Sequence, residues 1–119
     1  MNLRKTYTSL LTADLAAAEG WYTNLLGRRP DHRPMDTLVQ WELSDQSGLM
    51  VSTSDEIAGN SALFLYVDDL AAERLRLQGL GIELGDDNEG DYSTLAQVRD
   101  PDGNLITLAS PPARSFPPA

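Results

Sequence analysis

Few side chains in this chain of 119 residues are suited to catalysis. Cysteine is absent, which excludes thiolate nucleophiles, thiolate metal sites and disulfides. The single histidine, His32, is either a general base or lone metal ligand, or an exposed loop imidazole beside Arg33, and composition favours the exposed imidazole. Glu42 is either a buried carboxylate with a raised pKa that acts as a base, or an outward-facing strand residue. The sequence does not fix which side chains of the strand around Glu42 point inward, so both interpretations of Glu42 stay open.

An acidic segment at 83–91 is the next candidate for a site. It contains five carboxylates without the regular spacing of a calcium-binding loop, namely Glu83, Asp86, Asp87, Glu89 and Asp91. A solvated loop is therefore the prediction for this segment. The chain also lacks a glycine-rich phosphate loop, a Gly-x-Ser-x-Gly elbow and a defensible Ser-His-Asp spacing.

The formal net charge is −9 and the sequence pI is about 4.3. This charge argues against nucleic acid or an anionic membrane as a partner. It is compatible with a cationic ligand, although ordinary solubility is the simpler explanation. No apolar run approaches the roughly 20 residues that a membrane span needs, and the N-terminus has no basic-then-apolar signal. We therefore expect a cytoplasmic protein.

The elements that must position these side chains are organised around residues 95–108. The sequence Asp-Pro-Asp-Gly at 100–103 predicts a tight turn. Proline presets φ at the second position, aspartate side chains bond nearby backbone groups, and glycine accepts a positive φ. Because the flanking runs are short and apolar, the segment is predicted to be a β-hairpin.

An internal repeat with a spacing of 55 residues relates this hairpin to an earlier one. The spacing aligns 96–106 with 41–51, and it also aligns the Asp-Leu-Ala-Ala segment at 69–72 with the same four residues at 14–17. Two copies are too few for a solenoid, so we expect two copies of one supersecondary unit within a single domain.

Each half is predicted to contain a strand, a helix, and then two or three strands. The first half has a strand at 6–12, a helix capped by Asp14 and ended by Gly27, a loop or irregular edge strand at 28–36, and strands at 37–43 and 48–53. The second has a strand at 62–67, a helix from Asp68 or Asp69 to about Gln78, a strand at 82–84, an acidic loop at 85–91 and the closing hairpin. This order predicts an α+β fold, with helices on one face of a curved sheet and a concave wall on the other.

The boundaries of the halves follow from the same pattern. We predict one domain over 1–119, with module one at about 4–54, a linker at about 55–61, module two at about 62–110 and a proline-rich tail at 111–119. The tail is expected to wrap loosely or to be disordered.

Two motifs carry a family resemblance. They are Asp14-Leu15 followed by Trp21-Tyr22 and Leu25-Leu26-Gly27, and the closing Asp100-Pro101-Asp102-Gly103-Asn104. From about residue 4 to residue 109, the chain resembles the vicinal oxygen chelate superfamily, which includes glyoxalase I, extradiol dioxygenases and bleomycin-resistance proteins. The resemblance implies two βαβββ modules that form a curved, barrel-like mixed sheet around a cavity, with helices outside, and it implies dimerisation.

Enzymes of that superfamily bind a divalent metal at up to four positions, and the resemblance places these at Tyr7, Ser52, Ala62 and Thr107. The repeat of 55 residues relates Tyr7 to Ala62 and Ser52 to Thr107 in the same pairs. None of the four is His, Glu, Asp or Gln, and alanine has no donor atom. We therefore expect no metal and no cofactor, and we do not expect the metal-dependent chemistry of the family.

The family register makes several aromatic and hydroxyl side chains the walls of the cavity, which suits a planar, partly polar ligand. The predicted ligand-binding residues are Tyr7, Ser9, Trp41, Ser52, Phe64, Tyr66 and Thr107. The alternative is that these side chains simply fill the core. Trp21 and Tyr22 lie on a helix stripe and are predicted to be core residues.

The leading hypothesis is a metal-free, small-molecule-binding homodimer of the bleomycin-resistance kind, which sequesters an antibiotic or carries a metabolite. Its ligand would be aromatic or cationic. The second hypothesis is a lyase, isomerase or dioxygenase-like enzyme with a non-standard site, for which Glu42 or His32 is the candidate base. The third is an interaction or dimerisation module with a filled core.

Overall fold

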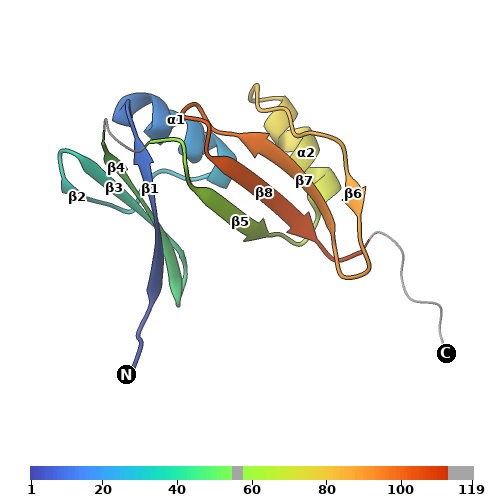
Figure 1. Ribbon diagram of the computed structural model, residues 1–119, viewed down its shortest axis with the longest axis horizontal. Helices are drawn as coiled ribbons and strands as arrows, with labels where there is room; N and C mark the ends of the chain where they lie inside the picture. Colours follow the sequence, from blue (N-terminus) through green and yellow to red (C-terminus); the bar gives the residue numbers. More distant parts are fainter. Residues whose placement is uncertain (55–57, 113–119) are drawn as a thin grey trace. The chain divides into compact units, whose positions relative to one another are not determined.

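A computed structural model describes residues 1–54 and 58–112 of the chain. Within these residues a strand, a helix and three strands follow one another twice, which confirms the predicted α+β fold of two βαβββ modules. The strands form two four-stranded sheets, one for each module (Figure 1). Part of the predicted linker and most of the predicted proline-rich tail lie outside the described residues.

The described residues form two compact units. The first contains the residues up to 62 together with 99–105, and the second contains the others. The turn of the closing hairpin therefore belongs to the first unit, although its two strands belong mainly to the second. No helix in the described part of the chain is long and apolar enough to cross a membrane.

The first sheet is mixed. Its elements are β1 (Thr6–Thr12), α1 (Leu15–Leu26), β2 (His32–Met35), β3 (Leu38–Ser44) and β4 (Ser47–Thr53). The strand order is β1-β4-β3-β2, in which β1 runs parallel to β4 and the other pairs are antiparallel. As predicted, the segment at 28–36 contains an irregular edge strand, because the register of β2 against β3 shifts between His32 and Met35.

Helix α1 begins and ends at the predicted caps. The Asp14 carboxylate accepts a hydrogen bond from the Ala17 N–H at 3.1 Å, and Gly27 ends the helix with φ of 73°. The buried residues of α1 recur at helical spacing and are Ala18, Tyr22 and Leu25. They belong to the core of the first unit with one face of the sheet, which contributes Leu10, Val39, Trp41, Leu49 and Val51.

The second sheet repeats this topology. Its elements are β5 (Ala62–Tyr66), α2 (Leu70–Gln78), β6 (Asn88–Glu89), β7 (Thr94–Arg99) and β8 (Leu105–Ser110), and the strand order is β5-β8-β7-β6 (Figure 1). Asp69 rather than Asp68 caps α2, since its carboxylate accepts from the Ala72 N–H at 3.0 Å. Leu70 and Leu77 are buried on this helix.

The predicted strand at 82–84 is wrong. Ile82 and Leu84 are buried, but the segment has no strand partner. The Arg74 guanidinium donates to the carbonyl oxygens of Leu84 and Gly85 at 3.1 and 2.8 Å, so a side chain supplies bonds that a neighbouring strand would otherwise supply. The strand of this module that precedes the closing hairpin is instead β6, which lies inside the predicted acidic loop.

The closing turn has the predicted geometry and an unexpected number of partners. The Asp100 carboxylate accepts from the N–H groups of Asp102 and Asn104 at 2.9 and 2.8 Å, and Gly103 has φ of 96°. The same carboxylate accepts from the buried Tyr22 hydroxyl at 2.5 Å. The Asp102 carboxylate accepts from the Thr12 hydroxyl, also at 2.5 Å. The acidic residues of this turn are therefore structural, because they join the turn to α1 and to the end of β1.

Candidate functional site

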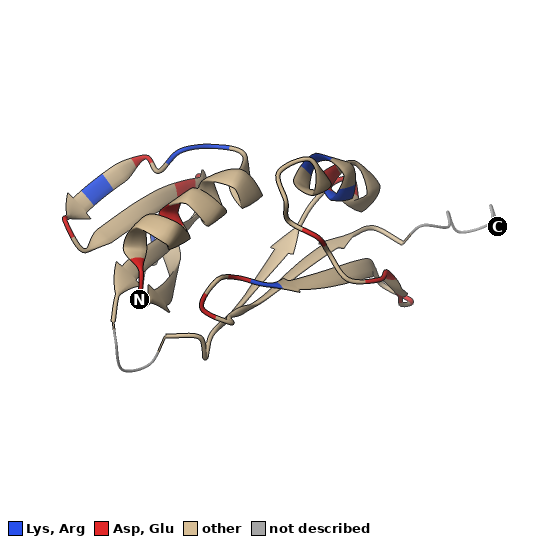
Figure 2. Cartoon of the chain, turned by 90° about the horizontal axis from the view of Figure 1, so that it is seen from above, with Lys and Arg blue, Asp and Glu red and all other residues tan. Residues whose placement is uncertain are grey.

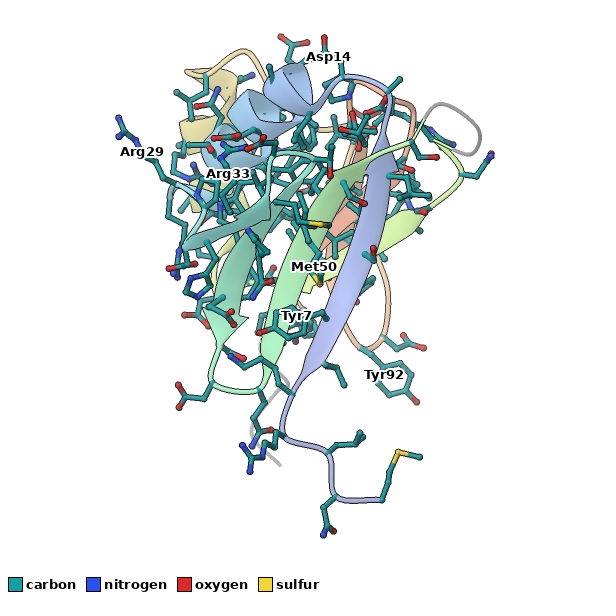
Figure 3. The ribbon with its side chains drawn as sticks, turned by 90° about the vertical axis from the view of Figure 1, so that its left-hand side faces the viewer. Tyr7, Asp14, Arg29, Arg33, Met50 and Tyr92 are labelled. Atoms are coloured by element: carbon teal, nitrogen blue, oxygen red, sulfur yellow. The ribbon has the colours of Figure 1, made fainter. Side chains whose placement is uncertain are left out.

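The two faces of the first sheet differ in character. Residues that lie opposite each other on neighbouring strands point to the same side. Tyr7 and Glu42 both lie opposite Gly48, and Ser9 and Gln40 both lie opposite Met50. These residues therefore share the face that α1 does not cover, which we call the open face (Figure 3). Its polar members from the described strands also include His32, opposite Gln40, and Ser52, opposite Leu38.

Trp41 does not lie on the open face. Its side chain is fully buried on the side of α1, its indole N–H donates to the Arg28 carbonyl oxygen at 2.9 Å, and its ring lies 6.2 Å from that of Tyr22. Trp41 is therefore a core residue, and the prediction that it lines a ligand wall with Tyr7 is wrong. The same parity turns Glu42 outward, because neighbouring residues of a strand point to opposite faces.

Glu42 is the centre of a hydrogen-bonded network on the open face. Its carboxylate accepts from Lys5 Nζ at 2.6 Å, from the Tyr7 hydroxyl at 2.9 Å and from Gln40 Nε2 at 2.8 Å. The His32 Nε2 atom lies 3.7 Å from the same carboxylate. Strands β1, β2 and β3 and the residue before β1 thus all contribute to one polar cluster, which we call the Glu42 cluster.

Gly48 makes this cluster possible. A Cβ atom at this position would lie 2.3 Å from Cε1 of the Tyr7 ring and 2.9 Å from the Trp41 carbonyl oxygen. The Tyr7 ring therefore lies across the backbone of β4, and its hydroxyl reaches Glu42 in β3. A side chain at residue 48 would occupy the space that the ring needs.

The hydrogen bonds of the cluster also fix its charge. The Lys5 ammonium and then the Gln40 amide lower the pKa of Glu42 to about 2, so the side chain is a carboxylate at neutral pH. The same carboxylate raises the pKa values of Lys5 and Tyr7, which therefore keep their protons. The raised pKa considered for Glu42 from sequence is wrong, because the side chain is paired on an open face. A carboxylate held in this state is a poor general base.

The second sheet also has an uncovered face. In β5, Leu63 is buried whereas Phe64 and Tyr66 are 57% and 60% exposed, so the two aromatic side chains lie on the side opposite Leu63. Ala62 shares their parity and is also exposed. In β8 the Thr107 hydroxyl is nearly buried and accepts a hydrogen bond from Gln97 Nε2 at 3.0 Å. The exposure of Phe64 and Tyr66 argues against the alternative that they fill a core.

The residues at the four family metal positions do not fit a metal ion. Tyr7 is a protonated phenol engaged with Glu42, and Ala62 has no donor atom. The Thr107 hydroxyl is engaged with Gln97, and Ser52 offers only a hydroxyl. Neutral hydroxyls are poor ligands for divalent cations. Among residues 1–54 and 58–112, no group of three or more His, Cys, Asp or Glu side chains is placed to hold a metal ion.

Sequence reasoning missed three members of the open face: Lys5, Gln40 and Met50. The signal that identifies Gln40 is the alternation of β3, in which Val39 and Trp41 are buried while Gln40 and Glu42 are not. A large apolar residue such as Trp41 fixes the inner face of such a strand. No comparable signal identifies Lys5, because it precedes β1.

Comparisons with known proteins agree with this architecture. Residues 7–109 match the family model of the glyoxalase-like domain. The glyoxalase/bleomycin resistance protein of Catenulispora acidiphila is similar in structure, with a TM-score of 0.85 and 28% identity over 93% of this chain and 100% of that chain. A comparison with curated protein sequences found no significant match.

Two more distant structures share the fold. An antibiotic-binding protein from a Streptomyces species has a TM-score of 0.75 and 23% identity, and it covers 93% of this chain and 96% of its own. A lactoylglutathione lyase from Agrobacterium tumefaciens has a TM-score of 0.73 and 22% identity, and it covers 87% of this chain and 90% of its own. The fold is therefore shared by a protein named for binding and by one named for catalysis.

Proposed function

Because the chain belongs to the glyoxalase-like domain family, we propose that it binds a small molecule without a metal ion. The proposed binding surfaces are the open face of the first sheet and the uncovered face of the second. One observation carries this proposal. The first family metal position is occupied by Tyr7, whose phenol donates a hydrogen bond to Glu42 at 2.9 Å and keeps its proton. The similarity to an antibiotic-binding protein and to a glyoxalase/bleomycin resistance protein supports a binding function.

The proposed ligand is aromatic or cationic, and antibiotic sequestration is the favoured role. On the first unit the proposed contacts are Tyr7, Ser9 and Ser52; on the second they are Thr107 and the exposed aromatic rings of Phe64 and Tyr66, which offer stacking surfaces. The net charge of −9 favours the approach of cations. We also propose a cytoplasmic location for the protein.

The first test is a thermal-shift screen of aromatic and cationic compounds, followed by calorimetric titration in the presence of EDTA. We expect at least one compound to raise the melting temperature and to bind equally well with and without the chelator. If stacking contributes, Phe64→Ala and Tyr66→Ala should each lower the affinity for that compound by about three- to tenfold. Leu75→Ala is the matched control, since Leu75 is 71% exposed on α2. Equal affinity in all three variants would remove Phe64 and Tyr66 from the ligand site.

We also propose that the protein is a homodimer. Large apolar side chains outside the proposed ligand contacts, such as Met35 and Leu80, are about half exposed in a single chain, and a partner copy would cover such apolar surface. Sedimentation analysis should give twice the chain mass of 13.0 kDa. A species of 13.0 kDa at micromolar concentration would contradict the proposal.

A further inference from the structure

The Glu42 cluster has the parts of a cation-binding site, and one of the chain's own cations occupies it. The Lys5 ammonium lies 2.6 Å from Glu42 Oε2 and 5.7 Å from the centroid of the Tyr7 ring. A carboxylate together with an aromatic face is a recurrent way to hold an ammonium group. Lys5 therefore shows which chemical group this position accepts.

The groups that hold the ammonium are fixed by strands. Glu42 belongs to β3 and Tyr7 to β1, and the Tyr7 hydroxyl and the Gln40 amide hold the carboxylate in place at 2.9 and 2.8 Å. The space for the ring is provided by the absence of a side chain at Gly48. This half of the site is therefore preorganised, and it needs no rearrangement to receive a cation.

The occupant is held much less firmly. Lys5 precedes β1, and the residues before it have no regular secondary structure, with Met1 and Leu3 highly exposed. The Lys5 and Glu42 side chains remain 27% and 23% exposed. Exposed ion pairs contribute little net stability, because both groups are solvated when they separate. Lys5 can therefore leave the site at low cost when another cation with additional contacts competes for it.

The surroundings indicate the rest of such a ligand. Ser9 of β1 and Met50 of β4 lie opposite each other on the open face, next to Tyr7 along β1, and provide a hydroxyl and a flexible apolar side chain. Tyr7 and Met50 are labelled in Figure 3. The thioether of methionine packs well against aromatic rings. Within residues 1–54, the basic residues other than Arg4 and Lys5 lie in the connection after α1 and in β2 (Figure 2).

We infer that the position of the Lys5 ammonium is the binding site for the cationic group of a small molecule, an ammonium carried on an aromatic or apolar body, which enters by displacing Lys5. This inference rests on the proposed binding function and assigns the part of the open face that selects for charge. Lys5 is then a tethered competitor, which keeps Glu42 paired when no ligand is present.

The test uses 2-phenylethylamine as the cationic probe and 2-phenylethanol as its neutral counterpart, both titrated by NMR at neutral pH. Lys5→Met removes the competing charge and should raise the affinity for 2-phenylethylamine by about two- to fivefold. This is the range expected when an exposed ion pair is lost. Arg4→Met is the matched control, because it removes one charge from the neighbouring exposed residue. It should leave the affinity within about 1.5-fold of the wild type, since solvent and salt screen separated charges.

A second variant tests the other half of the site. Glu42→Gln should lower the affinity for 2-phenylethylamine by at least about threefold and abolish the preference for the amine over the alcohol. Circular dichroism confirms that each variant is folded.

Several results would overturn the inference. They are an unchanged or weaker amine affinity in Lys5→Met, an equal gain in Arg4→Met, and an equal gain for 2-phenylethanol, which would indicate steric unblocking instead of charge. If neutral compounds bind while the amine is insensitive to Lys5, the inference fails and the proposed binding function stands. If neither these probes nor any compound of the thermal-shift screen binds, both fail.

Discussion

Replacing Tyr22 by phenylalanine removes one hydroxyl group from the core of the first unit. Tyr22 is 1% exposed, and its hydroxyl donates to the Asp100 carboxylate at 2.5 Å. Hydrogen bonds to charged acceptors contribute about 1.5–3 kcal/mol to stability. The same Asp100 oxygen also accepts from the Asn104 amide at 2.8 Å, so it is not left without a donor. We therefore expect Tyr22→Phe to lower the free energy of unfolding by about 2 kcal/mol.

Urea denaturation followed by circular dichroism measures this change, and the melting temperature should fall by roughly 8 °C for a chain of this size. Tyr92→Phe is the control, because Tyr92 is 90% exposed and its free energy of unfolding should stay within about 0.5 kcal/mol of the wild type. A loss below about 0.5 kcal/mol in Tyr22→Phe would refute the view that the closing turn is held by this bond.

We also expect the stability of the wild type and of Tyr22→Phe to differ in its dependence on alkaline pH. Burial, and then the hydrogen bond to Asp100, raise the pKa of the Tyr22 phenol above its usual value. A raised pKa means that the stabilising contribution is complete below the unfolded pKa of about 10 and is lost as the pH rises further. The wild type should therefore lose stability above pH 10 more steeply than Tyr22→Phe does, and parallel curves would contradict the assignment.

Three further predictions concern the open face of the first sheet and the uncovered face of the second. The pKa of Glu42 is lowered to about 2, so its contribution to stability is present above about pH 4.5 and is lost as the pH falls towards 2. In Glu42→Gln the melting temperature should therefore depend less on pH over this range. Gly48→Ala should cost about 1–3 kcal/mol by displacing the Tyr7 ring, and Tyr7→Ser in the same chain should recover part of it. Phe64→Ala and Tyr66→Ala should each change the melting temperature of the unliganded protein by less than about 3 °C, since both side chains are exposed.

The elements that the sequence predicts correctly are those with a local cause. Asp14 caps α1, Gly27 ends it at a positive φ, and the turn at 100–103 forms within the residues that encode it. Each of these depends on side chains and backbone groups within a few residues. Local chemistry is therefore sufficient to place the two helices and the closing hairpin.

The errors share a different cause, which is dependence on distant residues. The segment 82–84 has a strand-like pattern, but the guanidinium of Arg74 bonds the carbonyl of Leu84 in place of a strand partner. The direction of Glu42 depends on which neighbour is buried, and Trp41 is the one that packs near Tyr22. The Arg74 contact lies ten positions from Leu84, and the alternation of β3 places Glu42 on the outer face only once Trp41 is taken as the buried residue.

The part of the site that could be predicted is limited for the same reason. The structure places Tyr7 with Ser9 and Ser52 on one uncovered face and Phe64 with Tyr66 on another, while their role as ligand contacts stays a prediction. It does not predict that Lys5 pairs with Glu42, because the two residues are 37 positions apart. That contact requires the β1–β4–β3 order of the folded sheet.

The central claim is that the four family metal positions hold no metal in this chain. Elemental analysis of the purified protein, before and after incubation with Zn, Ni, Mn and Fe(II) and removal of the excess, tests it most directly. The account predicts well under one metal ion per chain in every sample, because the donor atoms at Tyr7, Ser52, Ala62 and Thr107 are absent or poor ligands. One metal ion per chain, retained through gel filtration, would contradict the account and favour a metalloenzyme.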